Sequence, residues 1–142
     1  MKLTNDQIYS LGMNGFAKIN YGMLPTEDAL SVYRLRRTIV KACAEIDAMA
    51  AEMRNDAWER EGQAKRASCA EYEQTKTGMT EEQYNAVIES VRSRAQAMIE
   101  ALGRESRDID VAPISFASWC LLMKDNPFLV GCEESFADFI AE

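Results

Sequence analysis

Apolar side chains recur over residues 27–61 at the spacing of an amphipathic helix. The stretch contains neither Gly nor Pro, and its apolar positions alternate steps of three and four residues. They are Val32, Leu35, Ile39, Ala42, Ile46, Met49 and Met53. This heptad spacing aligns one apolar stripe along a helix. We therefore expect a long helix over 27–61, capped by Thr26, whose stripe the other elements bury.

A second stripe with the same spacing follows later in the chain. It consists of Tyr84, Ile88, Val91, Ala95, Met98 and Leu102. Thr80 and Gln83 form a capping box before it, and Gly103 follows it as a C-terminal cap, which predicts a helix over 81–102. The two stripes predict an antiparallel helical hairpin within one chain. An oligomerising coiled coil is the alternative, although the pattern covers only about three heptads. We expect residues 62–79 to continue the first helix as a frayed end and then form a loop.

The chain before the long helix predicts a shorter N-terminal helix over 5–20. Thr4 and Gln7 form a capping box at its start. Ile8, Leu11, Phe16 and Ile19 give it an apolar face, while Gly12 and Gly15 weaken it or permit close packing against another backbone.

The last third of the chain is apolar and aromatic. Residues 109–111 alternate and predict a short strand that pairs with residues 1–4, and residues 114–130 are predominantly apolar. Asn126 and Pro127 suit a cap and the first position of a helix. Phe136, Phe139 and Ile140 share one face of a predicted final helix over 132–141, which should be docked.

Together these patterns predict a mainly α fold in a single helical domain over 1–142. It comprises a long antiparallel helical hairpin, a packed N-terminal helix and apolar C-terminal helices, with room for one small two-stranded sheet. A length of 142 residues suits one domain with its own core.

The chain contains no histidine, which excludes several classes of catalytic and metal-binding site. Its absence excludes Ser-His-Asp and Cys-His catalysis, as well as the histidine motifs of zinc proteases and di-iron bundles. Neighbouring acids such as Glu59 and Glu61 do not face each other on a helix, so they make a poor acid–base pair. We therefore predict a non-enzymatic protein with no catalytic residues, no metal ligands and no cofactor. The alternative is an enzyme of unknown type that uses Lys, Cys or a carboxylate in a polar pocket.

The cysteines and methionines are expected to fill the core. Cys43, Cys69, Cys120 and Cys132 are far apart and include no C-x-x-C pair, so we interpret them as reduced thiols acting as small hydrophobes. Met49, Met53, Met98 and Met123 are interpreted in the same way, with an adaptable binding groove as the alternative.

The net charge and the lack of long apolar runs indicate which partners and which location to expect. The net charge is −7, so direct binding to nucleic acid or to a membrane surface is not expected without a local basic patch. Residues 1–6 lack the apolar core of a signal peptide, and no apolar run approaches the ~20 residues of a membrane-spanning helix. We expect a cytoplasmic protein.

Two groups of side chains are candidate partner-binding residues. Arg34, Arg37 and Lys41 share a helix face that could take phosphate or an acidic protein surface; the alternative is a solvated helix back whose cations pair with carboxylates. Trp58 lies in a charged stretch with Arg54 and Glu61 and resembles an interface anchor. Alternatively, its ring packs on residues 62–79 or on the end of the second hairpin helix.

The opening Met1-Lys2-Leu3-Thr4-Asn5-x-Gln7-Ile8-Tyr9 resembles the start of a family of small tailed-phage proteins of unknown function. Similarity continues through Leu24-Pro25 into Tyr33-x-Leu35-x-Arg37. The resemblance implies an origin in a phage or prophage of Gram-positive or gut bacteria. The family has no known catalytic residues, so none is transferred.

The functional hypothesis is a phage-encoded protein that acts in the host cell cytoplasm by binding a host or phage protein. We favour an inhibitor of a host defence complex, of the anti-CRISPR type, because an acidic face can occupy a basic nucleic-acid channel. The alternative is a virion or tail-assembly component that self-associates as a homo-oligomer.

Overall fold

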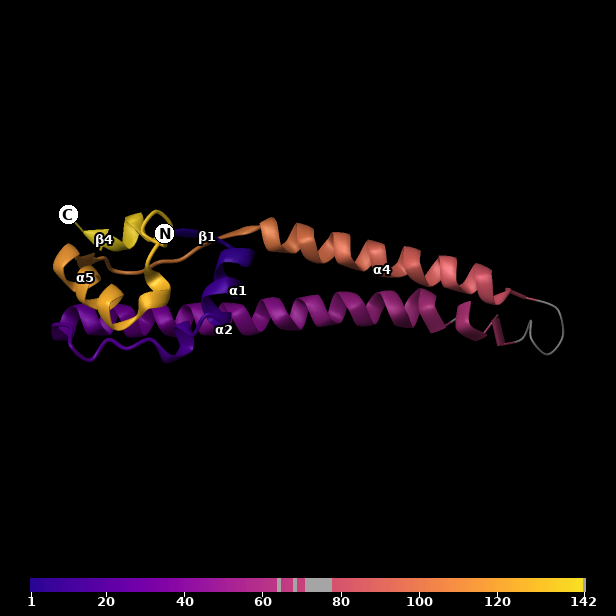
Figure 1. The fold of residues 1–142 in the computed structure, drawn as a ribbon, viewed down its shortest axis with the longest axis horizontal. Coiled ribbons are helices and arrows are strands. Elements are labelled where there is room, and N and C mark those ends of the chain that lie inside the picture. Colours follow the sequence, from indigo (N-terminus) through magenta and orange to yellow (C-terminus); the bar gives the residue numbers. More distant parts are fainter. Residues whose placement is uncertain (64, 68, 71–77, 142) are drawn as a thin grey trace. The chain divides into compact units, whose positions relative to one another are not determined.

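The computed structural model of the chain describes residues 1–63, 65–67, 69–70 and 78–141. Its elements, in chain order, are β1 (Lys2–Thr4), α1 (Asn5–Met13), η1 (Phe16–Lys18), α2 (Thr26–Ala57), η2 (Trp58–Gly62), α4 (Glu81–Arg104), β2 (Ser106–Asp108), β3 (Ile114–Ser115), α5 (Phe116–Asp125), η3 (Pro127–Leu129), η4 (Ala137–Phe139) and β4 (Ile140–Ala141) (Figure 1). The predicted mainly α fold is confirmed. The chain divides into two compact units: unit 1 comprises Met1–Ile46 and Arg104–Glu142, and unit 2 comprises Asp47–Gly103. The single domain over 1–142 stays a prediction.

The core of unit 1 forms around the first half of the predicted stripe. Val32, Leu35 and Ile39 of α2 are almost completely buried. They join apolar side chains from α1, η1 and the C-terminal segment: Ile8, Leu11, Phe16, Trp119, Leu122, Leu129, Phe136 and Phe139. Trp119 is only 1% exposed, and its indole N–H has no hydrogen-bond partner in the part of the chain that the structure describes. The centroid of its ring lies 5.4 Å from that of Phe136.

A short antiparallel sheet ties the N-terminus to the segment after α4. β1 pairs with β2 so that Lys2 lies opposite Asp108 and Thr4 opposite Ser106. The predicted pairing with residues 1–4 is confirmed, but the strand is Ser106–Asp108 instead of 109–111. The register explains the shift: Ile109 already pairs with Met1, its N–H donating to the Met1 carbonyl at 2.7 Å. Residues 110 and 111 therefore lie beyond the end of β1.

The N-terminal helix is shorter than predicted. The capping box is confirmed, since the Gln7 N–H donates to Thr4 Oγ1 and the Thr4 N–H donates to Gln7 Oε1. The helix ends at Met13 because Gly15 has a left-handed φ of 103°, and residues 16–18 then form the 3₁₀ turn η1. Gly12 permits close packing, as the sequence suggested: a Cβ at Gly12 would lie 2.7 Å from Cys43 Sγ.

The predicted final helix over 132–141 is wrong, although the docking of this segment is confirmed. Phe136 and Phe139 are buried, but only the 3₁₀ turn η4 forms there. The chain then becomes extended because Ile140 and Ala141 pair in parallel with Ile114 and Ser115.

Asn126 has a different role from the predicted cap. Pro127 does occupy the first position of the 3₁₀ turn η3, but the Asn126 side chain makes no capping hydrogen bond. Its Oδ1 accepts the Asn20 N–H at 2.8 Å, and its Nδ2 donates to the carbonyls of Asn20 and Leu122. The buried amide thus joins α5 to the segment before α2.

The ends of the two long helices differ from prediction by a few residues. α2 begins at Thr26 itself, and the Ala29 N–H donates to the Pro25 carbonyl, so Thr26 is not the cap. At the start of α4 the Thr80–Gln83 capping box is confirmed. Gly103 is not a C-terminal cap, because α4 continues to Arg104 and leads directly into the strand segment.

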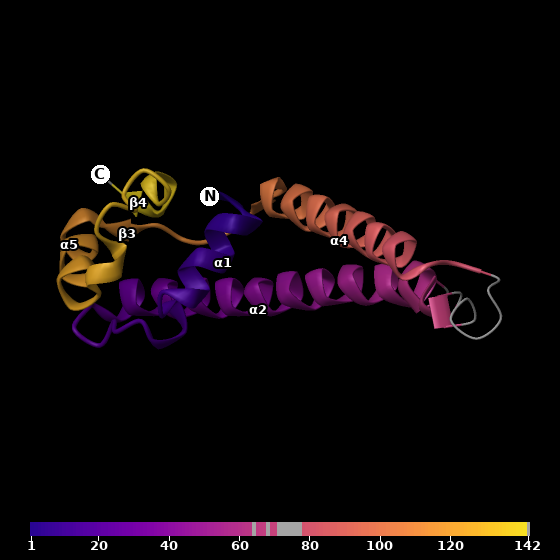
Figure 2. The ribbon, with the colours of Figure 1, turned by 45° about the vertical axis from the view of Figure 1, so that its right-hand side comes forward.

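Unit 2 contains the antiparallel hairpin. The last turns of α2 lie beside α4, which runs in the opposite direction (Figures 1 and 2). Ala50, Ile88, Val91, Ala95 and Leu102 are buried in this unit. Residues 63, 65–67 and 69–70 are helical, consistent with the predicted continuation, while the loop expected beyond them falls at 71–77, outside the described residues.

Each stripe departs from the prediction at one position in unit 2. Met49 is 37% exposed and Met98 is 52% exposed, while Ala50 is buried and Ile99 is half-buried. The core role predicted for Met49 and Met98 is therefore wrong. Met53 is half-buried and Leu102 is buried, as the pattern predicts, so the shift is confined to these two positions.

Candidate functional site

A groove of about 720 Å³ lies in unit 2 between the end of α2 and α4. Arg54 and Trp58 line it from one side, and Ile88, Arg92 and Ile99 line it from α4. Glu89 and Glu100 also line it, so its rim carries both signs of charge. An apolar floor with charges of both signs is typical of a specific protein interface.

Gly62 determines where the Trp58 ring lies. A Cβ at Gly62 would be 2.3 Å from Cε3 of Trp58 and 2.7 Å from Cζ3. The indole therefore lies directly on the Gly62 backbone, four residues ahead, within the π-helical turn η2. Such turns are often found at functional sites. The ring thus packs on Gly62, the first residue of the predicted 62–79 segment, which is here the end of a helical turn instead of a loop, and it also lines the groove.

Glu61 belongs to a second, smaller groove. It forms an ion pair with Arg94, and both line a space of about 220 Å³ together with Met53 and Met98. Ala57, Val91 and Ala95 line both grooves, so they form the seam between them. The structure thus brings Arg54 and Trp58 together and places Glu61 on the other side of that seam. An exposed ion pair of this kind contributes about 1 kcal/mol or less.

The three predicted cations of unit 1 are exposed on α2. Arg34, Arg37 and Lys41 have no carboxylate within 4 Å among the residues described, so the expected pairing with carboxylates is not seen there. The adjacent Arg36 is half-buried, and its Nε donates to the Ala17 carbonyl at 2.6 Å. Arg37 and Lys41 line a shared groove of about 400 Å³, which Arg34 does not.

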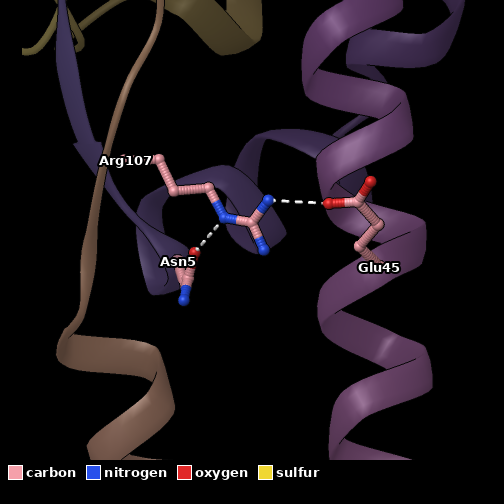
Figure 3. Close-up of polar contacts among 3 residues, drawn as sticks. All are labelled: Asn5, Glu45 and Arg107. Atoms are coloured by element: carbon pink, nitrogen blue, oxygen red, sulfur yellow. Dashed lines mark hydrogen bonds and ion pairs between the residues drawn. The ribbon is translucent and has the colours of Figure 1, made fainter.

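Arg107, Glu45 and Asp108 also line this groove, which therefore holds carboxylates as well as cations. The Nε of Arg107 donates to Oδ1 of the buried Asn5 at 2.8 Å, and its Nη1 lies 2.8 Å from Glu45 Oε2 (Figure 3). The guanidinium is therefore held from two sides, while Arg37 and Lys41 are exposed. Sequence patterns missed Arg107 because it lies in a three-residue strand with no periodicity.

The Arg107 contact also affects Glu45. Its hydrogen bond lowers the pKa of the Glu45 carboxyl, and the charges of Arg107 and Lys41 act in the same direction. A lowered folded-state pKa means that the ionised pair stabilises the fold above the unfolded pKa of about 4.3. That contribution is lost as the pH falls through the lowered folded-state value.

The cysteines differ in exposure. Cys69 is buried and Cys43 and Cys132 are half-buried, but Cys120 is exposed, so the core role predicted for it is wrong. Cys120 lies on the outer side of α5, whose buried face contains Trp119 and Leu122. Burial, with a smaller effect of Glu133, raises the pKa of the Cys132 thiol.

In the described ranges, no group of three or more His, Cys, Asp or Glu side chains could hold a metal ion. No helix there combines the length and apolar character needed to cross a membrane. Comparisons with protein-family models, curated proteins and solved structures found no match.

Proposed function

We propose that this protein acts by binding another protein through the groove beside Trp58, and that it catalyses no reaction. The observation that carries the proposal is the Trp58 ring held against Gly62 at the edge of an open groove. Trp and Arg dominate interface hot spots, and Arg54 lines the groove beside this Trp. A ring already held in place loses little conformational entropy on binding.

For the partner, we propose a host defence complex that this phage-encoded chain inhibits, as anti-CRISPR proteins do. The phage origin is supported by the resemblance of residues 1–9 to tailed-phage proteins. The net charge of −7 is supportive as well, because an acidic protein can occupy a basic nucleic-acid channel. The mixed charges around the groove suit a specific protein contact.

Affinity capture with matched variants tests this proposal. The immobilised chain is incubated with lysate of a host that expresses a CRISPR nuclease complex, and bound proteins are identified by mass spectrometry. Trp58→Ala should lose the captured complex. Met49→Ala, which removes an exposed apolar side chain outside both grooves, should retain it. Recovery of no nuclease component, or equal capture by both variants, contradicts the proposal.

The second candidate is a self-associating virion or tail-assembly component. It is favoured by one observation: Met98, half exposed, lines the smaller groove beside Met53 and the hairpin seam. A second copy could cover this apolar surface. Light scattering of the pure protein separates the two candidates, since the inhibitor should be monomeric. Detection of the chain in purified phage particles would favour the assembly role.

A further inference from the structure

The solvent face of α2 in unit 1 carries an outer stripe of exposed apolar side chains. Leu30, Tyr33 and Val40 are 44%, 39% and 38% exposed, and Arg37 lies in step with them. Their spacing of 3, 4 and 3 residues places them on one side of the helix. The buried stripe of Val32, Leu35 and Ile39 occupies the opposite side, so this outer stripe is not part of the core.

The same face is locally basic in an acidic protein. Residues 30–44 place Arg34, Arg37 and Lys41 on this face and contain no carboxylate, although the whole chain has a net charge of −7. Arg36 is turned to the Ala17 carbonyl instead, and Glu45 follows one helical turn after Lys41. On a helix with 3.6 residues per turn, Arg34, Arg37 and Lys41 fall within the arc that contains Leu30. Arg107 lines the groove of Arg37 and Lys41 as well, but its charge is paired with Glu45, and Asp108 lies in the same lining. Among the described residues, the unpaired positive charge of the face is therefore that of Arg34, Arg37 and Lys41.

We propose that this face docks a helical segment of a protein partner that presents carboxylates beside apolar side chains. The exposed stripe from Leu30 to Val40 rises by ~15 Å, which matches about three turns of an opposing helix. Carboxylates spaced i, i+4 on that helix would face the row Arg34, Arg37 and Lys41, whose own steps are three and four residues. Leu30, Tyr33 and Val40 would be covered by its apolar side chains.

The composition of the face favours a protein over a nucleic acid. A phosphate backbone offers no apolar surface for Leu30 and Val40, and the net charge of −7 opposes approach of a polyanion. A short acidic helix brings few charges and covers both aliphatic side chains. The face lies in unit 1, so the proposal does not depend on the Trp58 groove of unit 2.

Fluorescence anisotropy with defined probes tests the proposal. The first probe is a labelled 15-residue helical peptide with Glu at i, i+4 spacing beside a Leu stripe. The second replaces each Glu by Gln, and the third is a 15-nucleotide single-stranded DNA. We expect the Glu peptide to bind at least 10-fold more tightly than the other two. The affinity for the Glu peptide should also fall as NaCl is raised from 50 to 300 mM, because salt screens the attraction between the charges.

Variants then locate the binding. Arg37→Ala combined with Lys41→Ala should weaken binding of the Glu peptide at least 10-fold, and Tyr33→Ala should weaken it comparably. Lys18→Ala combined with Lys124→Ala removes two exposed cations of the same unit and should leave the affinity unchanged. Trp58→Ala should also leave it unchanged, which separates this proposal from the groove of unit 2.

Three results would overturn the proposal. They are equal affinity for the Glu and Gln peptides, tighter binding of the DNA than of the Glu peptide, and equal weakening by the Lys18/Lys124 control pair. All the substituted side chains of the face are exposed, so circular dichroism should show folded variants throughout.

Discussion

Replacing Gly62 by Ala should destabilise unit 2, although the same change in a helix is normally favourable by up to ~1 kcal/mol. The added Cβ would lie 2.3 Å from the Trp58 ring, whereas ordinary contact begins at 3.4 Å. The ring must therefore move by about 1 Å or more. It then loses the surface on which it packs.

The size of the effect follows from the area involved. Burial of a whole aromatic side chain covers about 150–250 Å², and Trp58 is half-buried, which gives roughly 100 Å². At ~25 cal/mol per Å² this packing is worth at most ~2.5 kcal/mol. Subtracting the ~1 kcal/mol gained from helix propensity leaves a net loss of up to ~1.5 kcal/mol.

Removal of the Trp58 ring should reverse the sign of the stability change that Gly62→Ala causes. In a Trp58→Ala background the new methyl group of Gly62→Ala meets no indole, so the substitution should stabilise by up to ~1 kcal/mol. Urea unfolding of the wild type, both single variants and the double variant, followed by circular dichroism at 222 nm, measures this coupling. If Gly62→Ala changes stability equally in both backgrounds, the assigned Trp58–Gly62 contact is wrong.

Three further predictions concern unit 1 and the hairpin. Gly12→Ala should lower the free energy of unfolding by about 1–3 kcal/mol, because the new Cβ meets Cys43 Sγ at 2.7 Å; the loss should shrink in a Cys43→Ala background. Glu45→Gln should make stability less dependent on pH below about 4.3, as thermal melts between pH 3 and 7 would show; an unchanged acid profile contradicts the assigned pKa effect. Ile46→Asp should cost at least ~3 kcal/mol, whereas Met49→Asp should cost less than ~1 kcal/mol; equal melting temperatures would show that the two positions are not differently buried.

The sequence predicted those parts of the fold that depend on local spacing. The stripe through Val32, Leu35 and Ile39 fixed α2, and the capping boxes at Thr4 and Thr80 identified the starts of α1 and α4. The predicted ends of elements are wrong where pairing with a residue distant in the sequence determines them. Strand β2 ends at Asp108 because of its register with β1, and the last residues are extended because they pair with β3.

The candidate surfaces were predictable only in part. Exposure of Arg34, Arg37 and Lys41 follows from their place opposite the core stripe. The separation of Glu61 from Trp58 does not, because it depends on which side of the helix–helix seam each side chain reaches. Arg107 joins the groove of Arg37 and Lys41 through strand pairing, which no local pattern encodes. The Trp58–Gly62 spacing of four residues was the one available signal for the ring contact.

The two tryptophans give each unit its own optical probe. Trp119, enclosed in unit 1 with its N–H unpartnered among the described residues, should emit at short wavelength. Trp58, half open to water in unit 2, should emit further to the red and be quenched more readily by iodide. Variants that keep one indole would therefore report whether the halves of the molecule melt together or in turn, without any label.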